Sequence, residues 1–126
     1  MEHHREGYYL TELISDEAVA WINMQRVETP FFLYVPYTAP HNPLQAKDDY
    51  QQKNISAEDW NKGSREDYIP VVEDLDKGVG KILDMLDEKG MTENTVFIFF
   101  SDNGPTKFGS AGILRGNKGR VFEGGI

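Results

Sequence analysis

Two short apolar runs and two amphipathic stretches organise the chain. The apolar runs are FFLYV at 31–35 and TVFIFFS at 95–101, and neither alternates apolar with polar residues. Continuous runs of β-branched and aromatic residues predict strands that are buried on both faces of a sheet. The amphipathic stretches, at 15–26 and at about 65–89, carry apolar residues at helical spacing. The pattern therefore predicts the order helix, strand, helix, strand.

Both predicted helices carry signals at their ends. In the first, Ser15 is placed as the N-cap, and the apolar face comprises Ala18, Val19, Trp21 and Ile22. In the second, Ser64 and Asp67 have the spacing of a capping box, and Gly90 is placed to end the helix. The apolar stripe expected on the second helix comprises Ile69, Val72, Leu75, Val79, Ile82, Leu83 and Leu86.

The second predicted helix contains two glycines, which lower its stability. Gly78 and Gly80 each cost roughly 1 kcal/mol of helix stability relative to alanine. Close packing of the helix on the sheet is the compensation that we expect.

The order of elements over 31–101 predicts a right-handed βαβ unit, in which the two strands are parallel. Both strands would then end at the same edge of the sheet, which brings His41 towards Asp102 and Asn103. An acid, an amide and a glycine after a strand can simply form a turn. They can also hold a ligand, because open α/β sheets bind ligands beyond the carboxyl ends of their strands. The shared edge favours a site.

The glycine-rich sequence from residue 106 onward surrounds Arg115, Lys118 and Arg120. It is either a flexible tail or a segment whose backbone approaches a ligand closely. Cations, a histidine and two oxygen ligands at one edge would suit an anionic substrate beside a hard metal ion.

Composition and charge narrow the class of protein. A chain of 126 residues fits one domain, and 39% hydrophobic residues indicate a globular protein. Its 13 basic and 21 acidic residues give a net charge of −8, which argues against a nucleic-acid partner. No apolar run approaches the roughly 20 residues that span a bilayer, so no membrane partner is expected. The absence of cysteine excludes disulfides, thiolate metal sites and a cysteine nucleophile.

The order of motifs resembles that of a known enzyme family. A histidine between prolines follows the first strand, and then come DLDKGVGKILDMLDEKG, NTVFIFFSDNG and LRGNKGRVFEGGI. From about Tyr9 onward the chain resembles the middle of the type I, formylglycine-dependent sulfatases of the alkaline phosphatase superfamily. The resemblance implies an α/β fold, a partial three-layer sandwich with a mainly parallel sheet that is incomplete in this chain.

The resemblance also implies roles for four residues. Asp102 and Asn103 match ligands of a divalent cation, most often calcium, with magnesium as the other choice; their oxygens are hard donors that suit either ion. Lys118 matches a lysine that contacts the sulfate and the ester oxygen. His41 matches a histidine that faces the scissile bond and assists the leaving alcohol. The implied substrate is a sulfate ester, either a small molecule or a sulfated glycan. Glu123, Gly124 and Gly125 belong to the same signature and are interpreted as structural.

Several motifs that are typical of the family are missing from this sequence. The family's Cys-or-Ser-x-Pro-Ser-Arg segment, its paired acidic metal ligands and its Lys-x-His pair have no match here. We therefore expect residues 1–126 to be a single fragment of a sulfatase catalytic domain, inactive alone and prone to self-association through exposed apolar surface. A periplasmic, secreted or lysosomal parent would each fit. The alternatives are a phosphate or phosphonate ester hydrolase of the same superfamily and a non-catalytic truncated module.

Overall fold

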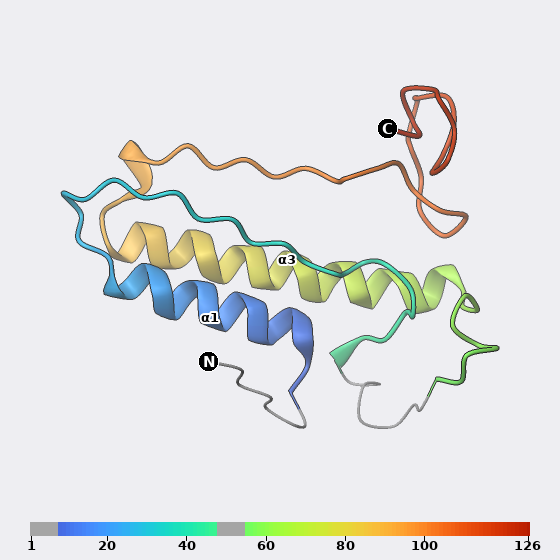
Figure 1. Ribbon diagram of the computed structural model, residues 1–126, viewed down its shortest axis with the longest axis horizontal. Coiled ribbons are helices and arrows are strands. Elements are labelled where there is room, and N and C mark those ends of the chain that lie inside the picture. Colours follow the sequence, from blue (N-terminus) through green and yellow to red (C-terminus); the bar gives the residue numbers. More distant parts are fainter. Residues whose placement is uncertain (1–7, 48–54) are drawn as a thin grey trace.

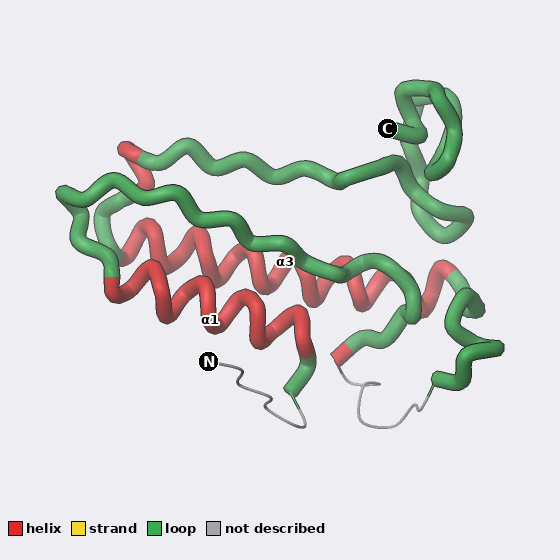
Figure 2. Tube along the Cα trace, viewed as in Figure 1, coloured by secondary structure: helices red, strands yellow, loops and turns green. Residues whose placement is uncertain are grey.

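The regular elements of the structure are helices. The computed structural model describes residues 8–47 and 55–126, which contain helix α1 (Leu10–Met24), helix α3 (Arg65–Glu88) and the short 3-10 helix η1 (Thr92–Asn94) (Figure 1). Within these two ranges no β-strand is formed (Figure 2). None of the helices described is long and apolar enough to cross a membrane.

The two runs predicted as strands are extended but unpaired. In Figure 1, residues 31–35 (cyan) and 95–101 (orange) run in the same direction and towards the same end of the molecule. No backbone hydrogen bond joins one run to the other. A sheet requires the N–H and C=O groups of neighbouring strands to meet at a spacing of about 4.8 Å. Because the described residues supply no such neighbour, the predicted parallel sheet is not confirmed.

The prediction that both runs are buried on both faces is wrong for the described residues. Phe31, Leu33 and Val35 pack against the helical core, whereas the alternate residue Phe32 is 89% exposed. Val96, Ile98 and the other apolar residues of 95–101 are also exposed. No described element covers that side of either run. The expected exposure of apolar surface is therefore confirmed.

Helix α1 begins earlier than predicted. Its N-cap is Tyr9, which makes no capping hydrogen bond through its side chain, and Ser15 lies inside the helix. Ser15 is fully buried, with its hydroxyl 2.9 Å from the Thr11 carbonyl oxygen and 2.8 Å from the Tyr37 hydroxyl. The predicted N-cap at Ser15 is therefore wrong: the helix starts at Leu10, and the Ser15 hydroxyl makes its hydrogen bonds to Thr11 and Tyr37. The predicted apolar face is confirmed, since Ala18 and Ile22 are buried in the core.

Helix α3 has the ends that the sequence predicts. Ser64 and Asp67 form both hydrogen bonds of the capping box. At the other end Gly90, with φ of 66°, and Met91 donate to the carbonyls of Asp87 and Leu86, the two bonds of a Schellman motif. The apolar stripe differs from the predicted one: Ile69 and Leu83 are each 42% exposed. The residues buried along α3 are Val71, Leu75, Gly78, Ile82 and Leu86.

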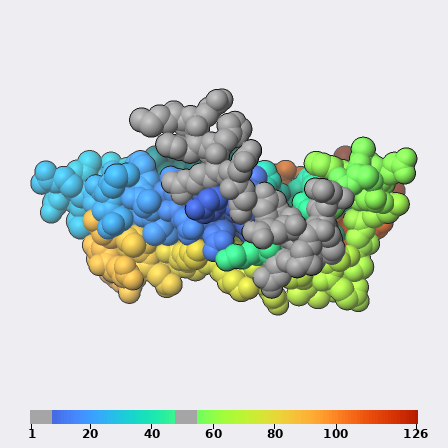
Figure 3. Space-filling model, turned by 90° about the horizontal axis from the view of Figure 1, so that it is seen from below, coloured from blue at the N-terminus to red at the C-terminus, as the bar shows by residue number. Residues whose placement is uncertain are grey.

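Two apolar clusters hold the elements together. Helices α1 and α3 lie side by side (Figure 3), and their larger cluster comprises Ala18, Ile22, Ile82, Leu86 and Met91. The second cluster joins α3 to two loops and comprises Leu44, Ala46, Val71 and Phe108. Three of its members, Leu44, Ala46 and Phe108, belong to the segments that follow His41 and Asn103 in the sequence.

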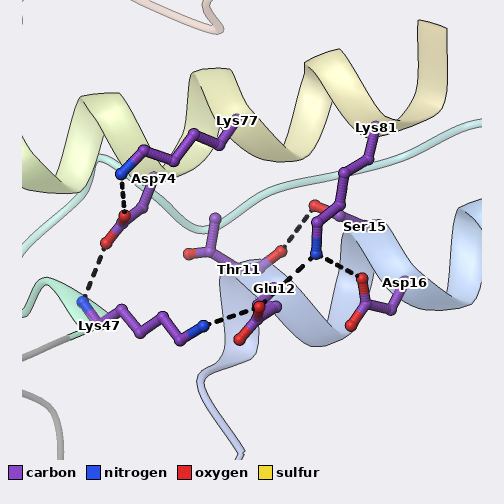
Figure 4. A network of polar contacts seen from close by, with 8 residues as sticks. All are labelled: Thr11, Glu12, Ser15, Asp16, Lys47, Asp74, Lys77 and Lys81. Carbon is purple, nitrogen blue, oxygen red and sulfur yellow. Dashed lines mark hydrogen bonds and ion pairs between the residues drawn. The ribbon is translucent and has the colours of Figure 1, made fainter. Parts of the chain in front are cut away.

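An ion-pair network fastens the loop after residues 31–35 to both helices (Figure 4). The Lys47 ammonium lies 2.9 Å from Glu12 of α1, and the Lys47 backbone N–H donates to the Asp74 carboxylate of α3 at 2.9 Å. Lys81 of α3 bridges to Asp16 at 2.8 Å. The hydrogen bond that Lys81 donates to the Asp16 carboxylate raises the pKa of Lys81 above its ordinary value. Through Lys47 these contacts hold the end of the loop that contains His41 against α1 and α3.

Candidate functional site

His41 lies in the loop that follows residues 31–35. Its backbone N–H donates to the Thr38 carbonyl at 3.0 Å, which closes a turn. Its Nδ1 lies 2.9 Å from the Asn42 carbonyl oxygen. A carbonyl only accepts hydrogen bonds, so this contact assigns the proton of the neutral ring to Nδ1. Nε2 is then the ring atom that can face a ligand, and the side chain is exposed.

Asp102 and Asn103 lie in the turn that follows residues 95–101. The Ser101 hydroxyl donates to the Asn103 carbonyl at 2.8 Å, which tightens the turn. The Gly104 N–H donates to the Gly125 carbonyl at 3.2 Å. A Cβ atom at Gly104 would collide with the Gly124 carbonyl oxygen, so only glycine allows this close approach. The turn is therefore held against the carboxyl-terminal loop.

Lys118 belongs to that carboxyl-terminal loop and is tied to the same turn. Its backbone N–H donates to the Pro105 carbonyl at 2.9 Å. Gly124 is buried and donates to the Arg115 carbonyl at 2.8 Å, and a Cβ atom there would lie 2.9 Å from that oxygen. These contacts favour a folded loop over a flexible tail. They also agree with the structural interpretation of Gly124 and Gly125.

The four residues singled out from the sequence line one cavity. His41, Asp102, Asn103 and Lys118 all border an open groove of about 1910 Å³ that follows both extended runs along their length and is also lined by residues of α1 and α3. Within the described part of the chain, the side chains of Asp102, Asn103 and Lys118 make no hydrogen bond or ion pair. The residues that border this groove thus come from three segments far apart in the sequence.

The donor set at this end fits a hard cation. Asp102 offers a carboxylate and Asn103 an amide oxygen, both of which suit calcium or magnesium. The described residues contain no cluster of three or more His, Asp or Glu side chains that could hold a metal ion. Calcium takes six to eight oxygens, so two side chains supply only part of its coordination shell.

Two further features of the site could not be read from the sequence. Trp60, which is 48% exposed, lines the same cavity, and Asn61 beside it lies 3.4 Å from the Asn42 side chain. Arg65, at the start of α3, donates to the Phe108 carbonyl at 2.9 Å and holds the turn after Asn103 on the helix. Neither residue belongs to a motif. Only the folded arrangement shows their proximity to the site.

Comparison with known proteins identifies the family. The sequence model described as "Sulfatase" matches residues 2–126. The chain is 34% identical over 125 residues to "Uncharacterized sulfatase YdeN" of Escherichia coli (strain K12), covering 93% of this chain and 21% of that protein. It is 32% identical over 123 residues to N-acetylgalactosamine-6-sulfatase of Homo sapiens, covering 93% and 22%. The chain belongs to the sulfatase family.

A solved structure agrees with this assignment. The crystal structure of Ps i-CgsB in complex with k-i-k-neocarrahexaose superposes with a TM-score of 0.76 at 38% identity, covering 96% of this chain and 27% of that one. The chain therefore spans about a fifth of the length of the curated relatives and about a quarter of this structural neighbour. The family assignment favours sulfatase chemistry over the phosphate and phosphonate alternatives.

Proposed function

We propose that residues 1–126 are one part of a sulfatase catalytic domain and that the complete domain hydrolyses sulfate esters. The observation that carries the proposal is that His41, Asp102, Asn103 and Lys118 all border the same open groove in a chain of the sulfatase family. The relatives are about five times as long as the matched region, which supports a larger catalytic domain.

In this proposal His41 and Lys118 act on the leaving group. When the S–O bond of the ester breaks, negative charge grows on the alcohol oxygen. The Lys118 ammonium offsets that charge, and His41 in its protonated form donates a proton from Nε2 to the departing oxygen. The Asn42 carbonyl accepts from Nδ1 and orients the ring for this transfer. Water supplies the oxygen that ends on the sulfate, so the products are an alcohol and sulfate. The nucleophile is proposed to lie outside these residues.

Asp102 and Asn103 are proposed to hold a divalent cation, with calcium preferred over magnesium. When bound, the cation would supply positive charge that stabilises the anionic sulfate group. The tight turn at Gly104 keeps both donors beside the Lys118 loop. Asp102 is exposed and Asn103 half-buried, and their unpartnered side-chain oxygens leave room for further ligands from other parts of the domain.

The finer fold proposal is a three-layer sandwich with a mainly parallel sheet. Two observations support it: the runs 31–35 and 95–101 extend in the same direction (Figure 1), and their outer side chains are apolar and exposed. Exposed contiguous apolar surface of this kind marks an interface with another element. Further strands and a second helical layer would cover it in the complete domain.

The substrate class that we propose is a sulfated carbohydrate. One relative is named for a sulfated amino sugar, and one structural neighbour was crystallised with a neocarrahexaose. Trp60 borders the cavity with half of its surface exposed, and an exposed indole can pack against the apolar face of a sugar ring.

The test is a parallel assay of the full-length protein on 4-nitrophenyl sulfate and 4-nitrophenyl phosphate. The proposal expects turnover of the sulfate ester that exceeds turnover of the phosphate ester. A matched protein with Lys118→Ala reports contaminating activity. Preferential hydrolysis of the phosphate ester would replace the proposal with the phosphatase alternative. No turnover of either ester would support a non-catalytic module.

A further inference from the structure

The basic residues of the chain are distributed unevenly. Residues 104–126 contain four basic residues and one acidic residue, whereas the rest of the chain contains nine basic and twenty acidic residues. The carboxyl-terminal loop is thus a positive region on a strongly acidic chain. Lys118, one of the four, is already assigned to the site. Lys107, Arg115 and Arg120 have no role in the proposed reaction, and we name these three the basic loop cluster.

The members of the basic loop cluster lack carboxylate partners within residues 8–47 and 55–126. Elsewhere in those ranges most cations form ion pairs with carboxylates, as Arg26, Lys47, Lys62, Lys77 and Lys81 do. Lys107 instead lies over the Phe108 ring at 4.8 Å, and Arg115 lies over the Phe122 ring at 3.9 Å. An aromatic face orients a cation and leaves its N–H groups able to bind an anion.

The cluster is positioned beside the candidate site by the backbone. Arg120 donates its N–H to the Asn117 carbonyl at 3.0 Å, which places Arg120 and Lys118 on one turn. Lys107 lies on the turn closed by the hydrogen bond from Gly109 to Thr106 at 3.1 Å. The hydrogen bond from Lys118 to Pro105 joins these two turns. The cluster therefore lies on the same two turns as Lys118 and Pro105, at the edge of the groove and outside its lining.

We propose that the basic loop cluster is an accessory anion-binding surface that holds further sulfate groups of a polysulfated carbohydrate. This inference rests on the proposed function and narrows its substrate to chains that carry more than one sulfate. The guanidinium group binds oxyanions through paired N–H donors, and two of the three cations are arginines. A single small sulfate ester at Lys118 would leave these cations uncompensated.

The experiment uses the full-length protein with 4-nitrophenyl sulfate as substrate and dextran sulfate as competitor. The double variant Lys107→Gln/Arg120→Gln removes two charges and keeps Arg115, whose stacking on Phe122 supports the loop. We expect the ratio of the dextran sulfate IC50 to the KM for 4-nitrophenyl sulfate to rise about threefold to tenfold, since each exposed charge contact contributes up to about fivefold. A smaller fraction of folded protein would lower the maximal rate and leave this ratio unchanged.

The matched control is Lys62→Gln/Lys77→Gln, which removes two exposed cations that are paired with carboxylates. We expect no change of the ratio in this variant, and an equal rise in both double variants would overturn the proposal. On the wild type, inhibition should weaken with added NaCl, and uncharged dextran should not inhibit. Absence of inhibition by dextran sulfate, or stronger competition by duplex DNA at equal charge, would also overturn it. If 4-nitrophenyl sulfate is not hydrolysed, direct binding of fluorescein-labelled dextran sulfate to the same variants still tests this surface separately.

Discussion

Alanine at Gly78 and alanine at Gly80 should have opposite effects on stability, although both positions lie in the middle of α3. Gly78 is buried against α1, and a Cβ atom there would collide with the Ser15 hydroxyl and lie 3.3 Å from the Tyr37 hydroxyl. A Cβ atom at Gly80 would meet nothing within 4 Å. The sequence pattern predicts that both glycines pack on a sheet. The structure instead places Gly78 against α1 and Tyr37, and Gly80 in open space.

The magnitudes follow from these contacts. Alanine in a helix interior is favoured over glycine by about 1 kcal/mol, so Gly80→Ala should stabilise the protein by up to about that amount. At Gly78 the same gain is opposed by overpacking, which costs about 1–3 kcal/mol, and by disruption of the buried Ser15–Tyr37 hydrogen bond, which is worth about 1 kcal/mol. We therefore expect Gly78→Ala to destabilise the protein by about 1–3 kcal/mol.

The assay is urea denaturation of the full-length protein followed by circular dichroism, with the free energy of unfolding compared among variants. Ser15→Ala removes the oxygen that obstructs the new methyl group. The double variant Gly78→Ala/Ser15→Ala should therefore be more stable than the sum of the two single changes by at least about 1 kcal/mol. Equal stabilisation by Gly78→Ala and Gly80→Ala would refute the close packing of α1 on α3, as would strict additivity in the double variant.

Four further predictions concern the site and the chain. Asp102→Ala in the full-length enzyme should lower metal content and largely abolish turnover, unlike Asp84→Ala on the exposed face of α3; unchanged metal content would reject the ligand assignment. His41→Ala and Lys118→Ala should each lower kcat by about 10²-fold or more, with greater losses on alkyl than on 4-nitrophenyl sulfates, and equal losses on both would contradict a leaving-group role. Because Asp16 raises the pKa of Lys81, this ion pair stabilises the fold below the ordinary lysine pKa of about 10.4, and the stability is lost as the pH rises through the higher folded value. Lys81→Met should remove that pH dependence, which amounts to a few tenths of a kcal/mol at this half-exposed position; a similar loss of stability at pH 8 and pH 11 would argue against it. The isolated chain of 126 residues should show no sulfatase turnover and should self-associate in sedimentation experiments, and a stable, active monomer would contradict both expectations.

Local signals in the sequence were sufficient where neighbouring residues make the decisive contacts. The capping box at Ser64 and the glycine end at Gly90 were predictable because each depends on a few consecutive residues. The start of α1 was not predictable in this way. Ser15 has the chemistry of an N-cap, but its hydroxyl meets Tyr37 from a segment 22 residues away, and α1 extends back to Leu10.

The candidate site shows the same division. The motifs that contain His41, Asp102, Asn103 and Lys118, together with the helix sequence DLDKGVGKILDMLDEKG, were enough in their order along the chain to indicate the sulfatase family. Their place along the same groove depends on contacts between distant segments, such as the hydrogen bond from the Lys118 N–H to the Pro105 carbonyl. The hydrogen bond from the Arg65 side chain to the Phe108 carbonyl likewise has no sequence signal, because it joins residues 43 positions apart.

The sequence by itself determined the two amphipathic helices, the two apolar runs and the chemistry at their ends, because periodicity and residue type are local properties. Only the tertiary structure decided which apolar side chains are covered. The runs 31–35 and 95–101 read as strands buried on both faces, yet the described residues cover only one face of 31–35 and leave 95–101 exposed. Burial and strand pairing require a neighbour, and a hydrophobic pattern specifies that a partner is needed without specifying where in space it lies.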